Sequence, residues 1–417
     1  MNKILFNLFF FLLFFLSIDF YFWQSIKNND LFIIPKNILF KYIYWLFSIF
    51  CIITLYITIV KYHEQDSPKF FVIIRSIILS IYLTKFISII PLIMDDLYRS
   101  LRYFNSLIFQ SPSKSSRISR LKFLQNFSLI IFFTILPTLL WGIFFGRHNF
   151  KKYFVNIKIN KWPKKINGLK IIQLSDLHLG SFTSKNPIEK IVNIINDEKP
   201  DLFVFTGDLV NNYYWESYEY IDILKKIKSK YGKFSILGNH DYGDYLGINK
   251  KTKKGLEDWN YNLSMIKKVH KKLGFKLLLN ENIEMKIKNC YFNLIGIENW
   301  GSGRFSKYGD LSKSTKNINN SIPSILLSHD PSSWEKITLK HTKKIDLQLS
   351  GHTHGFQIGI ELKNFKWSPS QLRYNQWAGL YKKNKSQIYV NRGVGYLGYA
   401  GRVGINPEIS VIKIFNG

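Results

Sequence analysis

Five short polar motifs in the second half of the chain offer side chains that can bind metal ions. The motifs are DLH, GD, GNHD, SHD and GHTH, and their candidate ligands are Asp176, His178, Asp208, Asn239, His329, His352 and His354. Imidazole nitrogen suits borderline transition metals, and carboxylate oxygen suits harder cations. One such residue alone is usually an ordinary hydrogen-bonded side chain, but seven in this arrangement indicate a metal site.

The spacing of the first two motifs suits two neighbouring metal ions. Asp176 and His178 are two residues apart, so in extended backbone both side chains would point to one side and could bind one metal. Gly207 permits a tight turn directly before Asp208. The carboxylate of Asp208 has two oxygens and could therefore bridge two cations.

The GHTH motif adds two further imidazoles from one short loop. We expect Gly351 to end its strand sharply, as Gly238 would before Asn239, so that His352 and His354 can each reach a different metal. No cysteine joins the set, because Cys51 and Cys290 belong to no CxxC pair. A mixed set of His, Asp and Asn fits Mn²⁺, Fe²⁺ or Zn²⁺.

The elements that must position these motifs are predicted strands. Apolar runs such as LKIIQL, LFVF, KFSIL, SILL and IDLQL each precede a motif, and helices are predicted in PIEKIVNIIND, SYEYIDILKKIKSK and MIKKVHKKLG. The segments YGDYLGINKKTKKGLEDWNYN and 302–321 are predicted to be loops. Alternating strands and helices followed by a strand-rich half indicate an α/β core that ends as mixed sheet. Ligands of such sheets bind at the carboxyl ends of the strands.

The first part of the chain is predicted to cross a membrane. Four apolar stretches, at about 4–23, 39–60, 70–94 and 124–145, approach or exceed the roughly 20 residues that span a bilayer as a helix. The first lacks a small-residue cleavage site, which favours an anchor over a signal peptide. The third carries Arg75 and Lys85, which indicate either a face turned to the bundle interior or a helix lying in the membrane interface.

We therefore expect a transmembrane region at 1–147 and a catalytic domain at 148–417. The basic segments RSLRYFNSLIFQSPSKSSRISRLK and RHNFKKYFVNIK would lie on opposite sides of the membrane, so the distribution of Lys and Arg leaves the orientation open. The expected location is the cell (inner) membrane. The net charge of +30 comes from Lys spread over the whole chain and not from a clustered patch, so no nucleic-acid partner is expected.

In their order, the motifs resemble those of the calcineurin-like metallophosphoesterase family. The resemblance covers residues 169–415, and the C-terminal NRGVGYLGYAGRVG is similar to the membrane-associated branch, which includes transmembrane proteins with a metallophosphoesterase domain and UDP-2,3-diacylglucosamine pyrophosphatases. It implies a four-layer α/β/β/α sandwich with two divalent metal ions. Phe356 stands where relatives often have glycine, which puts the carry-over of substrate in doubt.

The resemblance also implies a role for each residue. One metal would take Asp176, His178 and His354, the other would take Asn239, His329 and His352, and Asp208 would bridge them. His240 would lie over the phosphorus as a general acid or charge stabiliser, and Asp241 would orient it. A hydroxide held between the metals would attack a phosphoester or pyrophosphate bond.

The expected substrate is phosphorylated and either lipid-linked or nucleotide-containing, for example UDP-2,3-diacylglucosamine in lipid A synthesis, which would require a cytoplasmic catalytic domain. Three alternatives stay open: a transport protein with an accessory domain, a catalytically inactive scaffold that binds metal, and a mononuclear zinc hydrolase with three protein ligands. The sequence does not indicate an oligomeric state.

Overall fold

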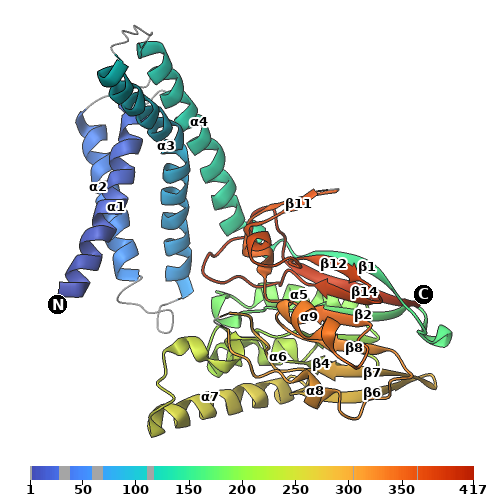
Figure 1. Ribbon diagram of the computed structural model, residues 1–417. Coiled ribbons are helices and arrows are strands. Elements are labelled where there is room, and N and C mark those ends of the chain that lie inside the picture. The colour runs from blue at the N-terminus through green and yellow to red at the C-terminus, as the bar shows by residue number, and fades with distance from the viewer. Residues whose placement is uncertain (1, 28–37, 59–68, 110–116, 304, 364) are drawn as a thin grey trace. The chain divides into compact units, whose positions relative to one another are not determined.

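The computed structural model describes residues 2–27, 38–58, 69–109, 117–303, 305–363 and 365–417. The chain forms two compact units, Met1–Phe144 and Phe145–Gly417 (Figure 1).

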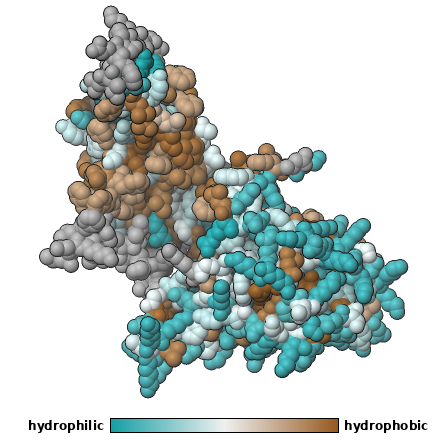
Figure 2. Space-filling view, in the orientation of Figure 1, coloured by the Kyte–Doolittle hydropathy of each residue, from teal (hydrophilic) through white to brown (hydrophobic). Residues whose placement is uncertain are grey.

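The first unit consists of helices that can cross a membrane. They are α1 (Asn2–Ile26), α2 (Ile38–Tyr56), α3 (Lys69–Phe109) and α4 (Arg117–Phe144). Each is long and apolar enough to span a bilayer, and Figure 2 shows apolar side chains over the visible surface of this unit. The predicted four spans are confirmed, although residues 59–60 of the second lie outside the described residues.

The helix that carries the predicted third span is longer than the span. The span was predicted to end at about residue 94, whereas α3 continues to Phe109 and α4 begins at Arg117. Arg99 pairs with Asp95 one turn earlier at 2.9 Å, and Arg120 of α4 also contacts Asp95, so ion pairs support the helix beyond the apolar stretch. At about 1.5 Å per residue, α3 is longer than the roughly 30 Å hydrocarbon core, and its polar end extends past it.

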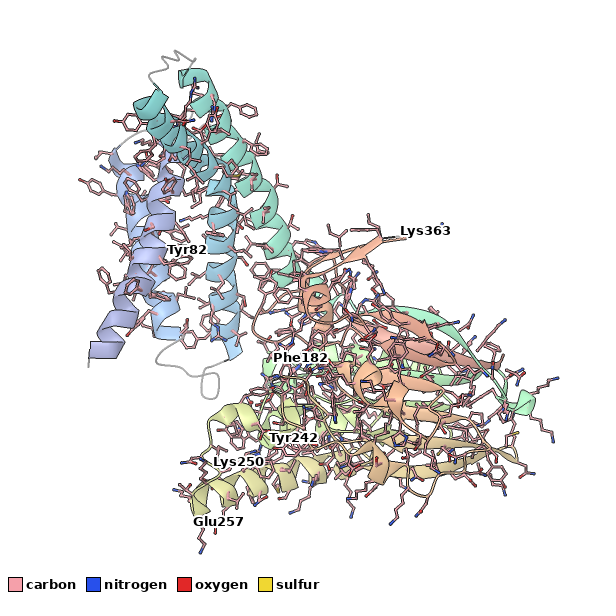
Figure 3. All side chains as sticks on the ribbon, in the orientation of Figure 1. Tyr82, Phe182, Tyr242, Lys250, Glu257 and Lys363 are labelled. Carbon is pink, nitrogen blue, oxygen red and sulfur yellow. The ribbon has the colours of Figure 1, made fainter. Side chains whose placement is uncertain are left out.

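A buried ion pair holds the centre of the helix bundle. The ammonium group of Lys85 lies 2.5 Å from the carboxylate of Asp19, and both side chains are almost completely buried. Tyr82, labelled in Figure 3, donates a hydrogen bond to the same carboxylate at 2.8 Å, and Tyr44 donates one to the main-chain oxygen of Asp19 at 2.8 Å. Lys85 therefore faces the bundle interior, as one of the two sequence interpretations expected.

Replacing Lys85 by methionine is expected to destabilise the full chain in detergent by about 3–5 kcal/mol, because the Asp19 carboxylate would lose its buried partner. The double variant Asp19→Asn/Lys85→Met should recover much of this loss, since neither charge would then be left unpaired. Thermal unfolding of both variants measures the difference. A Lys85→Met protein as stable as the parent would show that the pair does not support the bundle.

The second unit contains two six-stranded sheets. The first has the order β1-β14-β2-β3-β4-β5 and the second β12-β13-β9-β8-β7-β6. The strands of the first are β1 (Lys151–Ile159), β2 (Leu169–Leu174), β3 (Leu202–Phe205), β4 (Lys233–Ser235), β5 (Lys276–Leu277) and β14 (Glu408–Asn416). Those of the second are β6 (Glu281–Ile287), β7 (Cys290–Gly296), β8 (Ser324–Leu327), β9 (Leu347–Ser350), β12 (Gly379–Lys383) and β13 (Ser386–Val390).

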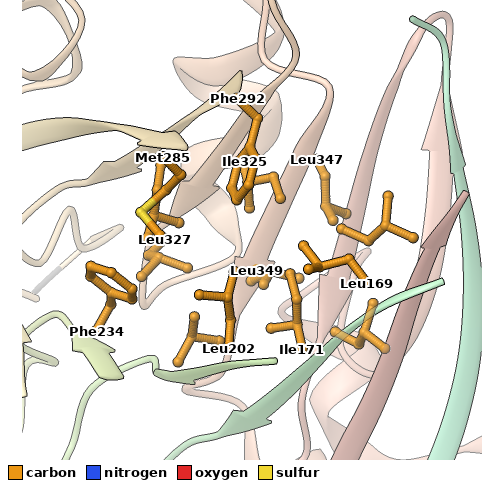
Figure 4. Close-up of a cluster of buried hydrophobic side chains, with 14 of the residues drawn as sticks. Leu169, Ile171, Leu202, Phe234, Met285, Phe292, Ile325, Leu327, Leu347 and Leu349 are labelled. Atoms are coloured by element: carbon orange, nitrogen blue, oxygen red, sulfur yellow. The ribbon is translucent and has the colours of Figure 1, made fainter. Parts of the chain in front are cut away.

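Both sheets are mixed, and they share one apolar core. In the first sheet, β2, β3, β4 and β5 run parallel to one another, whereas β14 runs antiparallel to β2. In the second sheet, β7, β8, β9 and β13 run parallel, whereas the edge strands β6 and β12 run antiparallel to their neighbours. Figure 4 shows Ile171 and Leu202 of the first sheet in one cluster with Ile325, Leu327 and Leu349 of the second. Burial of both inner faces drives the two sheets together.

Helices cover the outer faces of this pair of sheets. On the first, α5 (Asn186–Asp197) buries its apolar stripe and α7 (Lys253–Lys272) places His270 against Phe205. On the second, Leu311 of α8 (Leu311–Ser314) and Trp334 of α9 (Ser332–Lys336) join small apolar clusters with the strands. The expected α/β/β/α sandwich is confirmed.

Two predicted elements are corrected. SYEYIDILKKIKSK forms only a 3-10 turn, Tyr214–Tyr220, and the single-turn α6 (Ile221–Leu224), because the Glu216 carboxylate accepts hydrogen bonds from three preceding backbone amides. The expected loop after GNHD is helical in its second half, since Thr252 caps the start of α7. Residues 302–321 were also predicted to be a loop, and in the described part of this segment the only helix is the single turn α8.

Candidate metal centre

The backbone is strained at five candidate ligands. Asp176, His178, Asp208, His352 and His354 all have left-handed backbone, with φ of 53°, 49°, 59°, 74° and 50°. Such a conformation costs about 1–3 kcal/mol for each residue other than glycine and is typical of functional sites. The expectation that the first two lie in extended backbone is wrong, because β2 ends before both residues.

The glycines beside the ligands act in two ways. Gly207 has the positive φ of 96° that the sequence analysis expected of a tight turn. Gly238 and Gly351 have no positive φ in the structure; a Cβ atom on Gly238 would collide with the carboxylate of Asp208, and one on Gly351 with that of Asp176. These two glycines therefore provide space for the carboxylates.

The first ligand group joins the end of β2 with the loop after β9. It consists of Asp176, His178 and His354, whose ligand atoms lie within 4.8 Å of one another. His354 Nε2 is 3.0 Å from His178 Nε2 and 3.2 Å from a carboxylate oxygen of Asp176. The Asp176 carboxylate also accepts the backbone N–H of His352, which fixes the second loop against the first strand.

The second ligand group draws on the ends of β3 and β8 and on the same loop after β9. It consists of Asp208, His329 and His352, again within 4.8 Å. His329 donates Nδ1–H to the carbonyl of Thr206 at 2.7 Å, which leaves its Nε2 for a ligand. This Nε2 lies 3.2 Å from His352 Nδ1 and 3.1 Å from the side-chain oxygen of Asn239.

Asp208 lies between the two groups. The same carboxylate oxygen is 3.6 Å from His178 Nε2 of the first group and 3.2 Å from His329 Nε2 of the second. Its other oxygen accepts the backbone N–H of His240 at 2.9 Å. Asp208 is thus placed to contribute charge to both groups at once.

The electrostatics of both groups suit cations. Burial lowers the pKa of His178 well below its usual value and that of His352 to about 4, so both imidazoles can offer a lone pair. Burial also opposes a charge on His329, but the adjacent Asp208 carboxylate outweighs it and raises the pKa of His329 to about 10. A positive charge is therefore favoured in the second group.

The donor set fits divalent metal ions. Imidazole and carboxylate groups converge in a buried place, and two Nε2 atoms approach to 3.0 Å, an arrangement that a shared cation would stabilise. Nδ1 of His178 is buried with no hydrogen-bond partner among the described residues. Neither free cysteine belongs to the ligand groups, which fits Mn²⁺, Fe²⁺ or Zn²⁺.

His240 stands beside the first group. Its ring packs edge-on against His178 with ring centroids 4.9 Å apart, and its Nδ1–H donates to the carbonyl of Asn211 at 2.7 Å. The Asp241 carboxylate, which was expected to orient His240, binds backbone groups and not the ring. The Asp241 carboxylate accepts backbone N–H groups on both neighbouring loops, because the positive-φ turn at Asp208 exposes them toward it; the donors are Asp208, Leu209, Val210 and Gly238.

Replacing Asp241 by alanine is expected to lower both the stability and the metal affinity of the protein. Each buried backbone donor left without a partner costs about 1–3 kcal/mol, and the loop that carries Asp208 would lose its support. Thermal unfolding together with metal analysis checks this. A stable variant with normal metal content and impaired turnover alone would instead support a direct role in the reaction.

Three residues near the groups were not anticipated. The Tyr374 hydroxyl lies 2.8 Å from His352 Nε2, and Tyr245 accepts a hydrogen bond from the Asn239 amide at 2.8 Å. Arg402, almost fully buried, donates to the main-chain oxygens of His354 and Gly395. No sequence motif indicates that the two tyrosines lie near the ligand groups. For Arg402, the glycines around it were the only indication of a closely packed loop.

Two family descriptions match the chain. Residues 2–147 match "Probable Calcineurin-like phosphoesterase, transmembrane domain", and residues 169–356 match "Calcineurin-like phosphoesterase". The two matches cover the helical unit and most of the unit that carries both ligand groups.

Curated relatives agree with these matches. "Uncharacterized metallophosphoesterase YkuE" of Bacillus subtilis is 30% identical over 262 residues, which cover 62% of this chain and 83% of that protein. A "Transmembrane protein with metallophosphoesterase domain" of Danio rerio is 27% identical, covering 74% of this chain and 67% of that protein. "UDP-2,3-diacylglucosamine pyrophosphatase LpxG" of Chlamydia muridarum is 28% identical, covering 56% of this chain and 80% of that protein.

Proposed function

Since the chain belongs to the calcineurin-like phosphoesterase family, we propose that its two ligand groups hold two divalent metal ions that act together on one phosphoester or pyrophosphate bond. The chain is a metal-dependent phosphoesterase and a membrane protein. The observation that carries the proposal of a metal pair is the position of Asp208, within 3.6 Å of His178 and 3.2 Å of His329.

Each ligand residue has a role in this proposal. Asp176, His178 and His354 would hold one ion, Asn239, His329 and His352 the other, and Asp208 would be shared. When bound, two such ions neutralise phosphoryl oxygens and make water a stronger nucleophile. The strained loops and their hydrogen bonds to the neighbouring strand ends would hold these ligand side chains in place for the ions.

His240 would move a proton in the reaction. Because Nδ1–H is held by the Asn211 carbonyl, Nε2 is the atom that can face a substrate, and among the described residues it has no hydrogen-bond partner. A protonated Nε2 beside the first group would stabilise the departing oxygen and protonate it. Asp241 acts at a distance from this step, by holding the backbone that presents Asp208 and His240.

The substrate we propose is a phosphorylated molecule that is lipid-linked or contains a nucleotide. The four spans would keep the site near a bilayer, and a relative is named as a pyrophosphatase of UDP-2,3-diacylglucosamine. For such a UDP-linked lipid in lipid A synthesis, the unit Phe145–Gly417 would lie on the cytoplasmic side of the cell (inner) membrane.

Removing metal from the full chain is expected to abolish turnover of bis-p-nitrophenyl phosphate, and adding Mn²⁺, Zn²⁺ or Fe²⁺ should restore it with two equivalents bound. Metal analysis and the rate are measured on the same sample. Full activity with one equivalent would favour a mononuclear site.

Hydrolysis of UDP-2,3-diacylglucosamine, compared with UDP-glucose as the matched soluble substrate, then tests the lipid preference.

A further inference from the structure

A small hairpin beside the metal centre has its apolar side turned to solvent. Strands β10 (Ile360–Leu362) and β11 (Phe365–Trp367) pair antiparallel, with Ile360 opposite Trp367 and Leu362 opposite Phe365. These four side chains form one face, called here the outer face. Their exposed fractions are 49% for Ile360, 41% for Trp367, 66% for Leu362 and 55% for Phe365. Figure 2 shows apolar atoms along this projecting segment.

The polar side of the same hairpin is turned toward the protein. Glu361 accepts a hydrogen bond from Tyr153 at 2.9 Å and pairs with Arg392, while Lys366 donates to the carbonyl of Ala378 and lies over the Tyr381 ring at 4.7 Å. A hairpin on a water-soluble protein normally packs its apolar face on the core and leaves its polar face in water. Here the polar contacts hold the hairpin so that the apolar face points outward.

The hairpin is fixed to the rim of the metal centre at both ends. The loop that carries His352 and His354 leads directly into β10, and the chain after β11 returns to the centre at Tyr374, whose hydroxyl lies 2.8 Å from His352. Ser368, next to β11, donates a hydrogen bond to the main-chain oxygen of Gly355 at 2.6 Å. A partner that binds the outer face would therefore be held close to the metal ligands.

We propose that the outer face inserts into the surface of the lipid bilayer that the helices of this chain span. Tyr153, which contacts the hairpin through Glu361, follows the end of α4 by nine residues, and nine extended residues reach at most about 30 Å. The chain length between α4 and Tyr153 therefore allows the hairpin to reach the membrane surface. Lys363 at its tip (Figure 3) suits anionic headgroups, and Trp367 suits the interface between lipid and water.

A bilayer fits the outer face better than a protein partner. A standard protein–protein interface takes about 20–30 residues from each side, whereas the outer face offers four residues on a projecting tip. Insertion of a few aromatic and aliphatic side chains is enough to hold an already anchored domain at a membrane surface. The metal centre would then face substrates that lie in the membrane surface.

The test uses a fluorescent label on the full chain in lipid nanodiscs of phosphatidylcholine and phosphatidylglycerol. Both native cysteines, Cys51 and Cys290, are buried, so a cysteine in the variant Leu362→Cys can be labelled selectively with bimane. The matched control is Lys385→Cys, an exposed position at the turn of the β12–β13 hairpin. Nitroxide-bearing lipids should quench the label of Leu362→Cys several-fold more strongly than that of Lys385→Cys.

Two results would overturn the proposal. One is equal quenching of both labels by lipid and by iodide in the water; the other is a Leu362→Cys label shielded from iodide without lipid quenching, which would mean that protein covers the outer face. Phe365→Cys, the cross-strand neighbour, repeats the test if Leu362→Cys folds poorly. The readout is independent of turnover, so it stands apart from the proposed function.

Discussion

Asp208→Asn is expected to lose most activity and to weaken binding of both metal ions. Its carboxylate oxygen lies within 3.6 Å of one ligand group and 3.2 Å of the other, so loss of its charge affects both. Loss of an outer-shell partner typically costs a metal site about 10–100-fold, and loss of a shared ligand should cost more. Titration of metal-free protein with Mn²⁺ and the rate on bis-p-nitrophenyl phosphate measure the two effects.

Asp310→Asn is the matched control for this variant. Asp310 caps α8 by accepting the backbone N–H of Lys313 at 2.9 Å, and asparagine caps helices equally well. The control should therefore keep full activity and two equivalents of metal. If Asp208→Asn retained near-normal turnover, or lost one ion while binding the other with unchanged affinity, a shared ligand would be excluded.

His240→Ala is expected to lower the rate by about 10²–10⁴-fold while the metal content stays at the parental value. The ring packs against His178 but belongs to neither candidate ligand group, and its Nδ1–H donates to the Asn211 carbonyl, so its removal should take away the proposed proton donor and leave the ligand groups intact. The loss should be largest for substrates with poor leaving groups, because a leaving group that departs easily does not need a proton. Comparing p-nitrophenyl with methyl phosphodiesters measures this.

His341→Ala provides the comparison for His240→Ala. His341 is also half-buried, but it lies in the turn before β9 and contacts Thr315 and Lys343. It should lose little activity on either substrate. Metal loss in His240→Ala would contradict the role proposed for His240 and would place it among the ligands.

The candidate ligands could be predicted from the sequence because each lies shortly after a strand, and neighbouring parallel strands of a sheet end at the same edge. Asp176 and Asp208 follow neighbouring parallel strands of the first sheet, whereas His329 follows β8 of the second sheet and approaches Asp208 because the two sheets pack against each other. The backbone groups that Asp241 binds could not be predicted from the sequence. A carboxylate next to a histidine in the chain suggests a hydrogen bond between those two side chains. The glycine before Asp208 indicated a tight turn, but not that the left-handed backbone at Asp208 itself would direct amide groups toward Asp241.

Other features were missed for different physical reasons. The third span was predicted to end at about residue 94, where charged residues begin, but ion pairs such as Asp95 with Arg99 support the helix beyond that point. The hairpin Ile360–Trp367 has strands of three residues each, too short for a periodic pattern. Its apolar residues also face outward, whereas a prediction from sequence assumes that the apolar face of a strand packs on the core.

The place of β14 in the first sheet has a consequence for biogenesis. β14 is the last strand in chain order, yet it lies between β1 and β2, and Lys151 pairs with Glu408. During synthesis the four spans and the candidate ligands from Asp176 to His354 all leave the ribosome before β14, the strand that completes the first sheet. Because contacts so distant in sequence form slowly, the first sheet can be completed only after β14 has been synthesised and has entered between β1 and β2.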